Sequence, residues 1–355
     1  MKDNVSIAKA LAIILMVIGH SGIKWDVPIL FNMINLFHMP LFIFTAGYCF
    51  KWNYIDDVRN FIKKRVLGLW WPYVKYGLLF LVLHNVFFFL NIYNDSYGAV
   101  GSTAVSYLYD YSIFCKKIIN LLILSETEQL LGGFWFLKSL FWGSIFAVIS
   151  IKYLRRFIVF LSQTSIVLVC GALFLLLSVL FSLLAVKIPV VGIGSREFLT
   201  SFFFLFGILF RKREFAKGNF FSIIFFIVVF GGALVFNETV SMLNYDAWQV
   251  FPYIIFACIG IIMIMNVSDA LVKSNSLIKN FLTFTGCNTL DILTWHFLCF
   301  KIISFIRIVC DGRSIVELAY FPVIPDAKFW SMGYIFVGVA IPLFFAKIKK
   351  ICVRK

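Results

Sequence analysis

The chain alternates between long apolar runs and short polar breaks, and ten of these runs approach the length of a membrane-spanning helix. A helix that crosses the hydrocarbon core of a bilayer needs about 20 consecutive apolar residues. The pattern therefore predicts an all-α, polytopic integral membrane protein. The ten predicted helices run approximately over Val5–Ile23, Phe31–Phe50, Leu69–Ile92, Phe134–Ile151, Ser165–Val186, Phe198–Phe210, Phe220–Phe236, Val250–Val267, Cys287–Val309 and Ser331–Ala346.

The composition excludes a water-soluble protein. Of the 355 residues, 62% are hydrophobic and 14% are charged, whereas soluble domains are about 45–50% apolar and about 25% charged. The polar connections are short, so we expect one transmembrane domain over residues 1–355 with no separate soluble domain. The longest predicted outer segment, Tyr93–Gly133, contains the apolar piece Ile118–Leu124. We expect this segment to lie along the membrane surface or to re-enter the membrane as a lid.

The 32 basic residues outnumber the 17 acidic ones. Their positions along the chain indicate membrane topology rather than nucleic-acid binding. Short cytoplasmic loops collect Lys and Arg. With the N-terminus in the cytoplasm, the predicted inner segments hold 20 basic residues and the outer segments hold 7. Both termini are therefore predicted to be cytoplasmic, and we expect no nucleic-acid partner.

The cysteines and histidines do not form a metal-binding pattern. Most of the eight cysteines lie inside apolar runs, where they behave as small hydrophobic residues. Cys115 and Cys310 fall in predicted outer segments, where a disulfide between them is allowed but has no further support. The four histidines lack any ligand spacing such as HExxH. We expect no metal site.

The first predicted helix carries two ionisable residues, Lys9 and His20, that are eleven residues apart. Eleven residues make nearly three turns, so both side chains point the same way, about 16 Å apart along the axis. Ionisable groups within a span usually face the protein interior or a water-filled path. Lys9 also has a simpler interpretation, because it lies near the inner end and can extend to the lipid headgroups. The His20 side chain cannot extend to the headgroups in this way, so we expect it to have a functional role.

The second predicted helix contains Phe37-His38-Met-Pro40, followed by Gly47-Tyr48. We expect Pro40 near the start of this helix, where its missing N–H costs little. The short outer link before this helix would bring His38 close to His20. A basic run then ends in Lys63-Lys64-Arg65; such a cluster binds either lipid phosphates or the phosphates of a nucleotide-bearing donor.

Several motifs occur in a fixed order along the chain. They are Lys9, eleven residues before His20, with Gly19-His20, then Phe37-His38-Met39-Pro40-Leu41-Phe42 with Gly47-Tyr48, the basic run before Pro72-Tyr73, Trp135-Phe136-Leu137, and Asn288-Thr289-Leu290 followed by His296-Phe297. In this order they resemble acyltransferase family 3, the integral-membrane acyltransferases that modify bacterial surface glycans. The last group looks most like the branch of fucose-4-O-acetylase-like proteins.

The resemblance implies transfer of an acetyl or other short acyl group from acyl-CoA to a sugar hydroxyl of a surface polysaccharide or its lipid-linked precursor. It places the protein in the bacterial cytoplasmic membrane, with acyl-CoA as co-substrate and no permanently bound cofactor. The family histidine falls on His20, and its preceding basic residue falls on Lys9, where arginine is common. The paired-arginine motif falls on Arg65 and Gly68, so the second arginine is missing here.

The chemistry of acyl transfer requires the same residue types. A sugar hydroxyl is a poor nucleophile, and an imidazole can remove its proton as it attacks a thioester. We assign His20 as this general base. The developing oxyanion needs a hydrogen-bond donor, for which His38, His296 and Asn288 are candidates. His296 could also orient the acceptor together with Asp291, or be a satisfied buried histidine.

The remaining candidates concern binding. Arg65, with Lys63 and Lys64, suits the phosphates of CoA, because guanidinium and ammonium groups pair with phosphates. Lys9 would then line the path of the flexible pantetheine arm toward His20. Trp135 is either a packing aromatic or a platform for the sugar, and we expect His84 to be a core residue.

Two other classes of protein fit part of the pattern. The leading alternative is a transporter or flippase for a lipid-linked saccharide, which would use intramembrane cations to follow a diphosphate. Such folds often show internal repeats and interrupted helices, and the sequence shows neither clearly. A third interpretation is a non-enzymatic membrane partner in a polysaccharide assembly complex.

Overall fold

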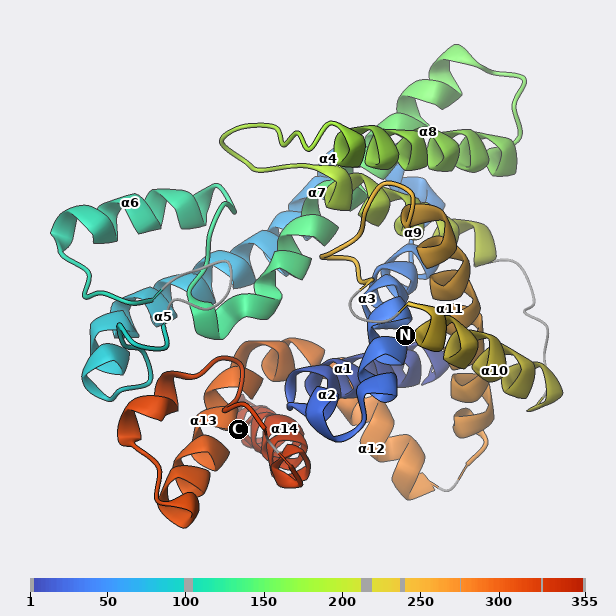
Figure 1. The fold of residues 1–355 in the computed structure, drawn as a ribbon. Coiled ribbons are helices and arrows are strands. Elements are labelled where there is room, and N and C mark those ends of the chain that lie inside the picture. Colours follow the sequence, from blue (N-terminus) through green and yellow to red (C-terminus); the bar gives the residue numbers. More distant parts are fainter. Residues whose placement is uncertain are drawn as a thin grey trace. The chain divides into compact units, whose positions relative to one another are not determined.

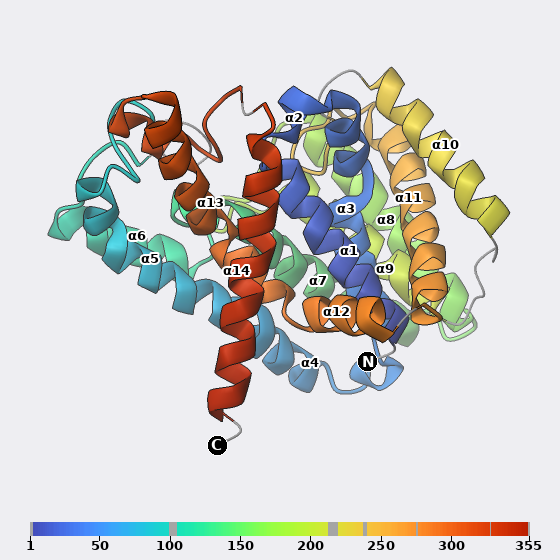
Figure 2. The ribbon, with the colours of Figure 1, turned by 90° about the horizontal axis from the view of Figure 1, so that it is seen from below.

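The computed structural model describes residues 3–98, 105–211, 219–236, 240–274, 276–326 and 328–353, and these are mainly helical (Figures 1 and 2). Two isolated bridges, Ile188 with Ile193 and Ser241 with Asn244, are the β-structure in these ranges. The elements are α1 (Asp3–His20), α2 (Ile23–Asp26), α3 (Pro28–Tyr48), η1 (Trp52–Tyr54), α4 (Val58–Arg65), the π-helix η2 (Val66–Trp70), α5 (Trp71–Phe89), α6 (Tyr111–Leu122), η3 (Gln129–Phe134), α7 (Trp135–Phe157), α8 (Gln163–Leu183), α9 (Ser195–Phe210), α10 (Asn219–Val235), α11 (Val250–Val272), α12 (Ser276–Cys287), α13 (Thr289–Asp311), η4 (Ile315–Ala319) and α14 (Trp330–Val353).

All ten predicted membrane segments form helices. Eight helical segments in the described part of the chain are long and apolar enough to cross a membrane: Asp3–His20, Pro28–Tyr48, Val58–Phe89, Gln129–Phe157, Gln163–Leu183, Val250–Val272, Thr289–Asp311 and Trp330–Cys352. The other two, α9 with 16 residues and α10 with 17, are shorter than a full span. The prediction of an all-α polytopic membrane protein is confirmed. The sidedness stays a prediction, because some of the basic residues that carry it, such as Lys212 and Arg213, lie outside the described residues.

Among the helices that were not predicted, α6 and α12 are the longest, with 12 residues each. α6 includes part of the apolar piece expected along the surface, and Asp110 caps it by accepting a hydrogen bond from the Ile113 amide at 2.8 Å. α12 lies in a predicted inner connection, and its Lys279 pairs with Asp3 at 2.9 Å. Both helices are amphipathic and short, so a search for span-length apolar runs misses them.

The expected position of Pro40 is wrong. α3 begins at Pro28, which places Pro40 inside the helix rather than at its start. A proline there cannot donate a hydrogen bond to the carbonyl oxygen four residues earlier.

The disulfide that the sequence allowed between Cys115 and Cys310 is not formed, because both cysteines are free thiols.

The chain divides into two compact units. The first comprises Met1–Ala12, Asn32–Trp71 and Phe136–Gly286. Within it α8 packs beside α9 and α10 beside α11 (Figure 1). α3 and α9 approach each other through glycines, since a Cβ on Gly47 would lie 1.9 Å from the Phe204 carbonyl oxygen and one on Gly207 would lie 2.2 Å from the Phe44 carbonyl oxygen. Small residues permit this backbone contact between membrane helices, which explains the Gly47-Tyr48 motif.

The second unit comprises Ile13–Phe31, Pro72–Trp135 and Cys287–Lys355. Its α13 and α14 lie side by side (Figure 2). Two buried cations of α13 hold the following loop: Lys301 donates to the carbonyls of Leu318 at 2.8 Å and Tyr320 at 2.7 Å, and Arg307 donates to those of Ile324 at 3.0 Å and Asp326 at 2.9 Å. These bonds explain how two charges are accommodated in an otherwise apolar helix.

Candidate active site

The second unit brings two of the predicted histidines together. His20 is the last residue of α1, and His296 lies on the second turn of α13. The centroids of their rings are 5.7 Å apart and the ring planes are inclined by 25°. Phe297 contacts both, with its ring centroid 4.9 Å from that of His20 and 3.9 Å from that of His296. His20 is half-buried and His296 is fully buried, so the pair lies in an apolar setting.

The hydrogen bonds of His296 define its tautomer. Its Nδ1 lies 2.9 Å from the Ile292 carbonyl oxygen and 3.1 Å from the Leu293 carbonyl oxygen. A carbonyl only accepts, so Nδ1 carries the hydrogen and the neutral ring presents a lone pair at Nε2. This Nε2 is buried and has no hydrogen-bond partner among the described residues. Because an orphaned buried polar atom costs stability, it marks a place for a ligand group.

A glycine pair in η3 lies directly against this site. A Cβ on Gly133 would lie 2.8 Å from Leu293 Cδ1 and 3.9 Å from His296 Cε1. A Cβ on Gly132 would lie 3.1 Å from Phe321 Cζ and 3.6 Å from Phe297 Cε2. The two glycines therefore let the backbone before α7 approach the histidine pair. The predicted outer segment Tyr93–Gly133 ends at this pair, and nothing in the sequence pattern indicates its approach to the histidines.

His38 belongs to the first unit. It is buried on α3, and its Nδ1 donates to the Ile34 carbonyl oxygen at 2.7 Å. A neutral ring with this tautomer also offers a lone pair at Nε2. The expected proximity of His38 to His20 concerns residues of different units and stays a prediction.

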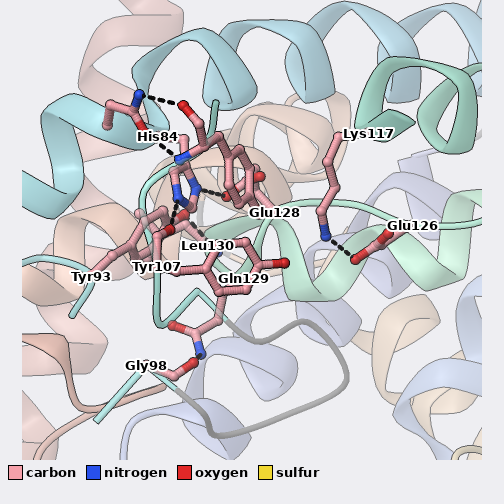
Figure 3. Close-up of polar contacts among 11 residues, drawn as sticks. His84, Tyr93, Gly98, Tyr107, Lys117, Glu126, Glu128, Gln129 and Leu130 are labelled. Atoms are coloured by element: carbon pink, nitrogen blue, oxygen red, sulfur yellow. Dashed lines mark hydrogen bonds and ion pairs between the residues drawn. The ribbon is translucent and has the colours of Figure 1, made fainter. Parts of the chain in front are cut away.

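The fourth histidine, His84 on α5, has both ring nitrogens engaged (Figure 3). Its Nδ1 lies 2.9 Å from Glu128 Oε2, and its Nε2 lies 3.0 Å from the Tyr107 carbonyl oxygen. The Tyr109 ring stacks on the imidazole at a centroid distance of 3.4 Å. Burial and the Glu128 carboxylate raise the pKa of Tyr93 and Tyr109, so both phenols stay protonated. His84 is thus a hydrogen-bonded core residue, as predicted, and has no nitrogen left for catalysis.

The predicted donor-binding cations lie in the first unit. Lys63 and Lys64 are exposed on α4, and Lys64 donates to the Tyr54 hydroxyl at 2.7 Å. Arg65 is half-buried, and its guanidinium carbon lies 4.7 Å from the Phe61 ring centroid and 5.4 Å from that of Phe204. Consecutive residues on a helix point about 100° apart, so these three cations do not converge on one point. Lys9 is half-buried on α1.

The three predicted acceptor-binding residues lie at the starts of helices in the second unit. Asn288 is buried at the N-cap of α13, and Trp135 is the half-buried first residue of α7. Asp291, in the first turn of α13, interacts electrostatically with Lys349 and Lys350 of α14. Asp291 and His296 are five residues apart, which turns their side chains about 140° from each other on the helix. They therefore do not share a helix face.

The second neighbour that sequence reasoning missed is Phe297, which contacts both imidazoles. In the sequence it appears as part of the His296-Phe297 motif, which does not indicate its contact with His20. Within the described ranges, no three His, Cys, Asp or Glu side chains are grouped so that they could hold a metal ion.

Most of the chain matches a known protein family. Residues 3–306 match a family described as an acyltransferase domain. Neither the curated proteins nor the solved structures contain a significant match to the chain. The matched region includes all ten predicted site residues, from Lys9 to His296.

Proposed function

Because the chain belongs to acyltransferase family 3, as the match over residues 3–306 shows, we propose that it O-acylates a sugar at the membrane. The acyl group is acetyl or another short acyl group, and acyl-CoA donates it. The acceptor is a hydroxyl of a surface polysaccharide or of its lipid-linked precursor, and the enzyme works in the bacterial cytoplasmic membrane. The family match supports acyl transfer in general; the donor, the acceptor and the location are our proposals.

The observation that carries the proposal is the histidine pair. A half-buried imidazole, His20, lies beside a second imidazole whose Nε2 is buried without a partner. The apolar surroundings exclude competing water and strengthen electrostatic interactions within the site. Such a site suits abstraction of a proton from a hydroxyl group, which is the difficult part of O-acylation.

In the proposed reaction, His20 removes the proton of the sugar hydroxyl as the oxygen attacks the thioester carbonyl. A C–O bond forms, the C–S bond breaks, and the imidazolium returns its proton to the departing CoA thiolate. The lone pair of His296 Nε2 accepts a hydrogen bond and so orients the acceptor. This role fits its tautomer better than donation to the oxyanion, which would require a protonated ring. Asn288 remains the proposed donor to the oxyanion, whereas His38, whose neutral ring also offers only a lone pair at Nε2, would have to be protonated to donate.

The donor would approach from the cytoplasm. The exposed ammonium groups of Lys63 and Lys64, with the guanidinium of Arg65, are suited to the phosphates of CoA. Lys9, on the same helix as His20, would line the path of the pantetheine arm. In this arrangement the acyl group crosses the membrane while CoA does not.

The test is an acyl-transfer assay with purified protein and labelled acetyl-CoA. Free CoA should appear only when a glycan acceptor is present, and the label should move to the glycan. NMR of the surface glycan from cells with and without the gene should show an O-acyl signal that depends on the gene. CoA release that is independent of every glycan, together with an unchanged NMR spectrum, would contradict the proposed acceptor class.

A further inference from the structure

A lysine in the first unit lacks a counter-ion within bonding distance. Lys138 lies in the first turn of α7 and is only 7% exposed. Over the ranges that the structure describes, its ammonium makes no hydrogen bond and no ion pair. A buried, unpaired charge is costly, and proteins normally compensate it.

The nearest acidic group is already used by other donors. Glu197 of α9 is 1% exposed. Its Oε1 accepts from the Ser139 hydroxyl at 2.7 Å and lies 3.4 Å from Arg196 Nε, and its Oε2 accepts from the Gly194 amide at 2.8 Å. Glu197 therefore fixes the start of α9 and leaves the ammonium of Lys138 without a direct bond.

Two more cations lie within electrostatic range of Lys138. Lys138 interacts with Arg196 and Lys187 as well as with Glu197. Lys187 packs against the loop before α9, where a Cβ on Gly194 would lie 3.2 Å from its Cγ. In the same loop Gly192 adopts a φ of +58°, and a Cβ there would lie 3.2 Å from the Lys138 Nζ. The absence of a side chain at Gly192 thus avoids a crowded contact with the ammonium.

We propose that Lys138, Lys187 and Arg196 form a binding site for a phosphate group at this end of α7. Three cations against the single carboxylate of Glu197 leave an excess of two positive charges. A phosphate monoester or a diphosphate matches this excess, because a phosphate monoester carries about −1.5 to −2 charges at neutral pH. The positive N-terminal end of α9 adds to the attraction.

The location of the site also favours a phosphate. Lys138 lies in the first turn of α7, within the candidate span Gln129–Phe157, and Lys187 lies in the connection between α8 and α9. The ends of membrane helices lie at the depth of lipid phosphates, where basic side chains bind them. Phosphate can reach this place on a lipid or free in solution, and the experiment below distinguishes the two sources.

The test measures thermal unfolding of the purified full-length chain in detergent. One series contains inorganic phosphate, with chloride at equal ionic strength as the reference. A second contains phosphatidic acid, with diacylglycerol as the phosphate-free reference. A shift with both probes, at lower concentration for phosphatidic acid, would indicate a lipid-borne phosphate; a shift with inorganic phosphate alone would indicate the free ion. The absence of a shift with either probe would overturn the proposal.

Variants connect the binding to the site. Lys138→Met should weaken binding at least about tenfold, because a charge-assisted hydrogen bond is lost. Lys138→Arg should retain binding. Lys116→Met removes an exposed cation from α6 in the other unit and should bind like the wild type. Equal binding by wild type and Lys138→Met would overturn the proposal.

A variant that does not disturb the core covers the case in which Lys138→Met fails to fold. Lys187 is exposed, so Lys187→Met should fold and should weaken binding about threefold or more. Unchanged binding in Lys187→Met would also overturn the proposal. The readout does not depend on acyl transfer, so failure of this site and failure of the proposed reaction are distinguishable.

Discussion

His20 and His296 lie with ring centroids 5.7 Å apart although they come from helices at opposite ends of the chain, α1 and α13. Despite this proximity, the Nε2 of His296 makes no hydrogen bond within the described structure. A hydroxyl group that enters beside the two rings would supply the missing partner. The pair therefore combines a base for the attacking hydroxyl group, His20, with a hydrogen-bond acceptor for a second hydroxyl group of the same sugar, His296.

We expect His20→Ala to abolish acyl transfer. Loss of a general base typically costs about 10²- to 10⁴-fold in rate. The assay is acceptor-dependent release of CoA, and immunoblotting should show the same amount of protein in the membrane. Lys24→Ala, which removes an exposed cation on α2 close in sequence, should retain wild-type activity. Normal glycan acylation by His20→Ala would remove the assignment of His20 as base.

His296→Phe should separate activity from stability. The substitution keeps an aromatic ring against Phe297 but deletes the orphaned nitrogen, whose burial costs about 1–3 kcal/mol. We expect a loss of about 100-fold or more in rate, with a thermal midpoint equal to or above that of the wild type. Trp295→Phe, a change of the preceding ring on α13, serves as the control and should keep most activity. An active and destabilised His296→Phe enzyme would indicate a purely structural histidine.

Gly133→Ala should disturb the site from the η3 side. The new Cβ would lie 2.8 Å from Leu293 Cδ1, and overpacking of this kind typically costs about 1–3 kcal/mol. We expect a lower thermal midpoint and a several-fold loss of acyl transfer. The double variant Gly133→Ala/Leu293→Val removes the clashing methyl and should recover part of both losses. Gly231→Ala on α10, where a Cβ meets nothing within 4 Å, should change neither quantity.

Glu128→Gln should loosen the segment between α5 and α7. Glu128 and His84 form a buried pair whose side chains are 3% and 1% exposed, and losing a hydrogen bond to a charged group costs about 1.5–3 kcal/mol. We expect a lower thermal midpoint and faster proteolytic cleavage within residues 105–128. Glu126→Gln breaks the partly exposed pair with Lys117 and should cost about 1 kcal/mol or less. Equal effects of the two variants would contradict a special role for the buried pair.

The helices could be predicted because each long apolar run has one stable arrangement in lipid. Lipid offers no hydrogen-bond partners to exposed backbone N–H and C=O groups, so such runs form helices, which satisfy these groups internally. The ends of the helices could be predicted less well. α3 extends upstream to Pro28, and α4, η2 and α5 join into one segment, Val58–Phe89. α6 and α12 depend on caps and ion pairs rather than on hydropathy, which explains why they were missed.

The site was only partly predictable from the sequence. His20 and His296 stood out because imidazoles are rare in apolar helices. Their adjacency depends on the packing of α1 and α13, and sequence spacing carries no information on that packing. Gly133 could not be assigned for the same reason, since its importance comes from Leu293 and His296, which are distant in sequence. Lys138 directly follows the Trp135-Phe136-Leu137 motif, yet its lack of a partner becomes visible only with Glu197 in place.

The bonds from Lys301 and Arg307 to the loop after α13 limit how a substrate can reach the histidine pair. Phe321 of this loop lies with its ring centroid 4.6 Å from that of Phe297, so the loop covers one side of the site. Lifting it would strip two buried cations of four carbonyl acceptors at once. The loop therefore stays closed over this side of the site, and a sugar has to reach the histidine pair from another side.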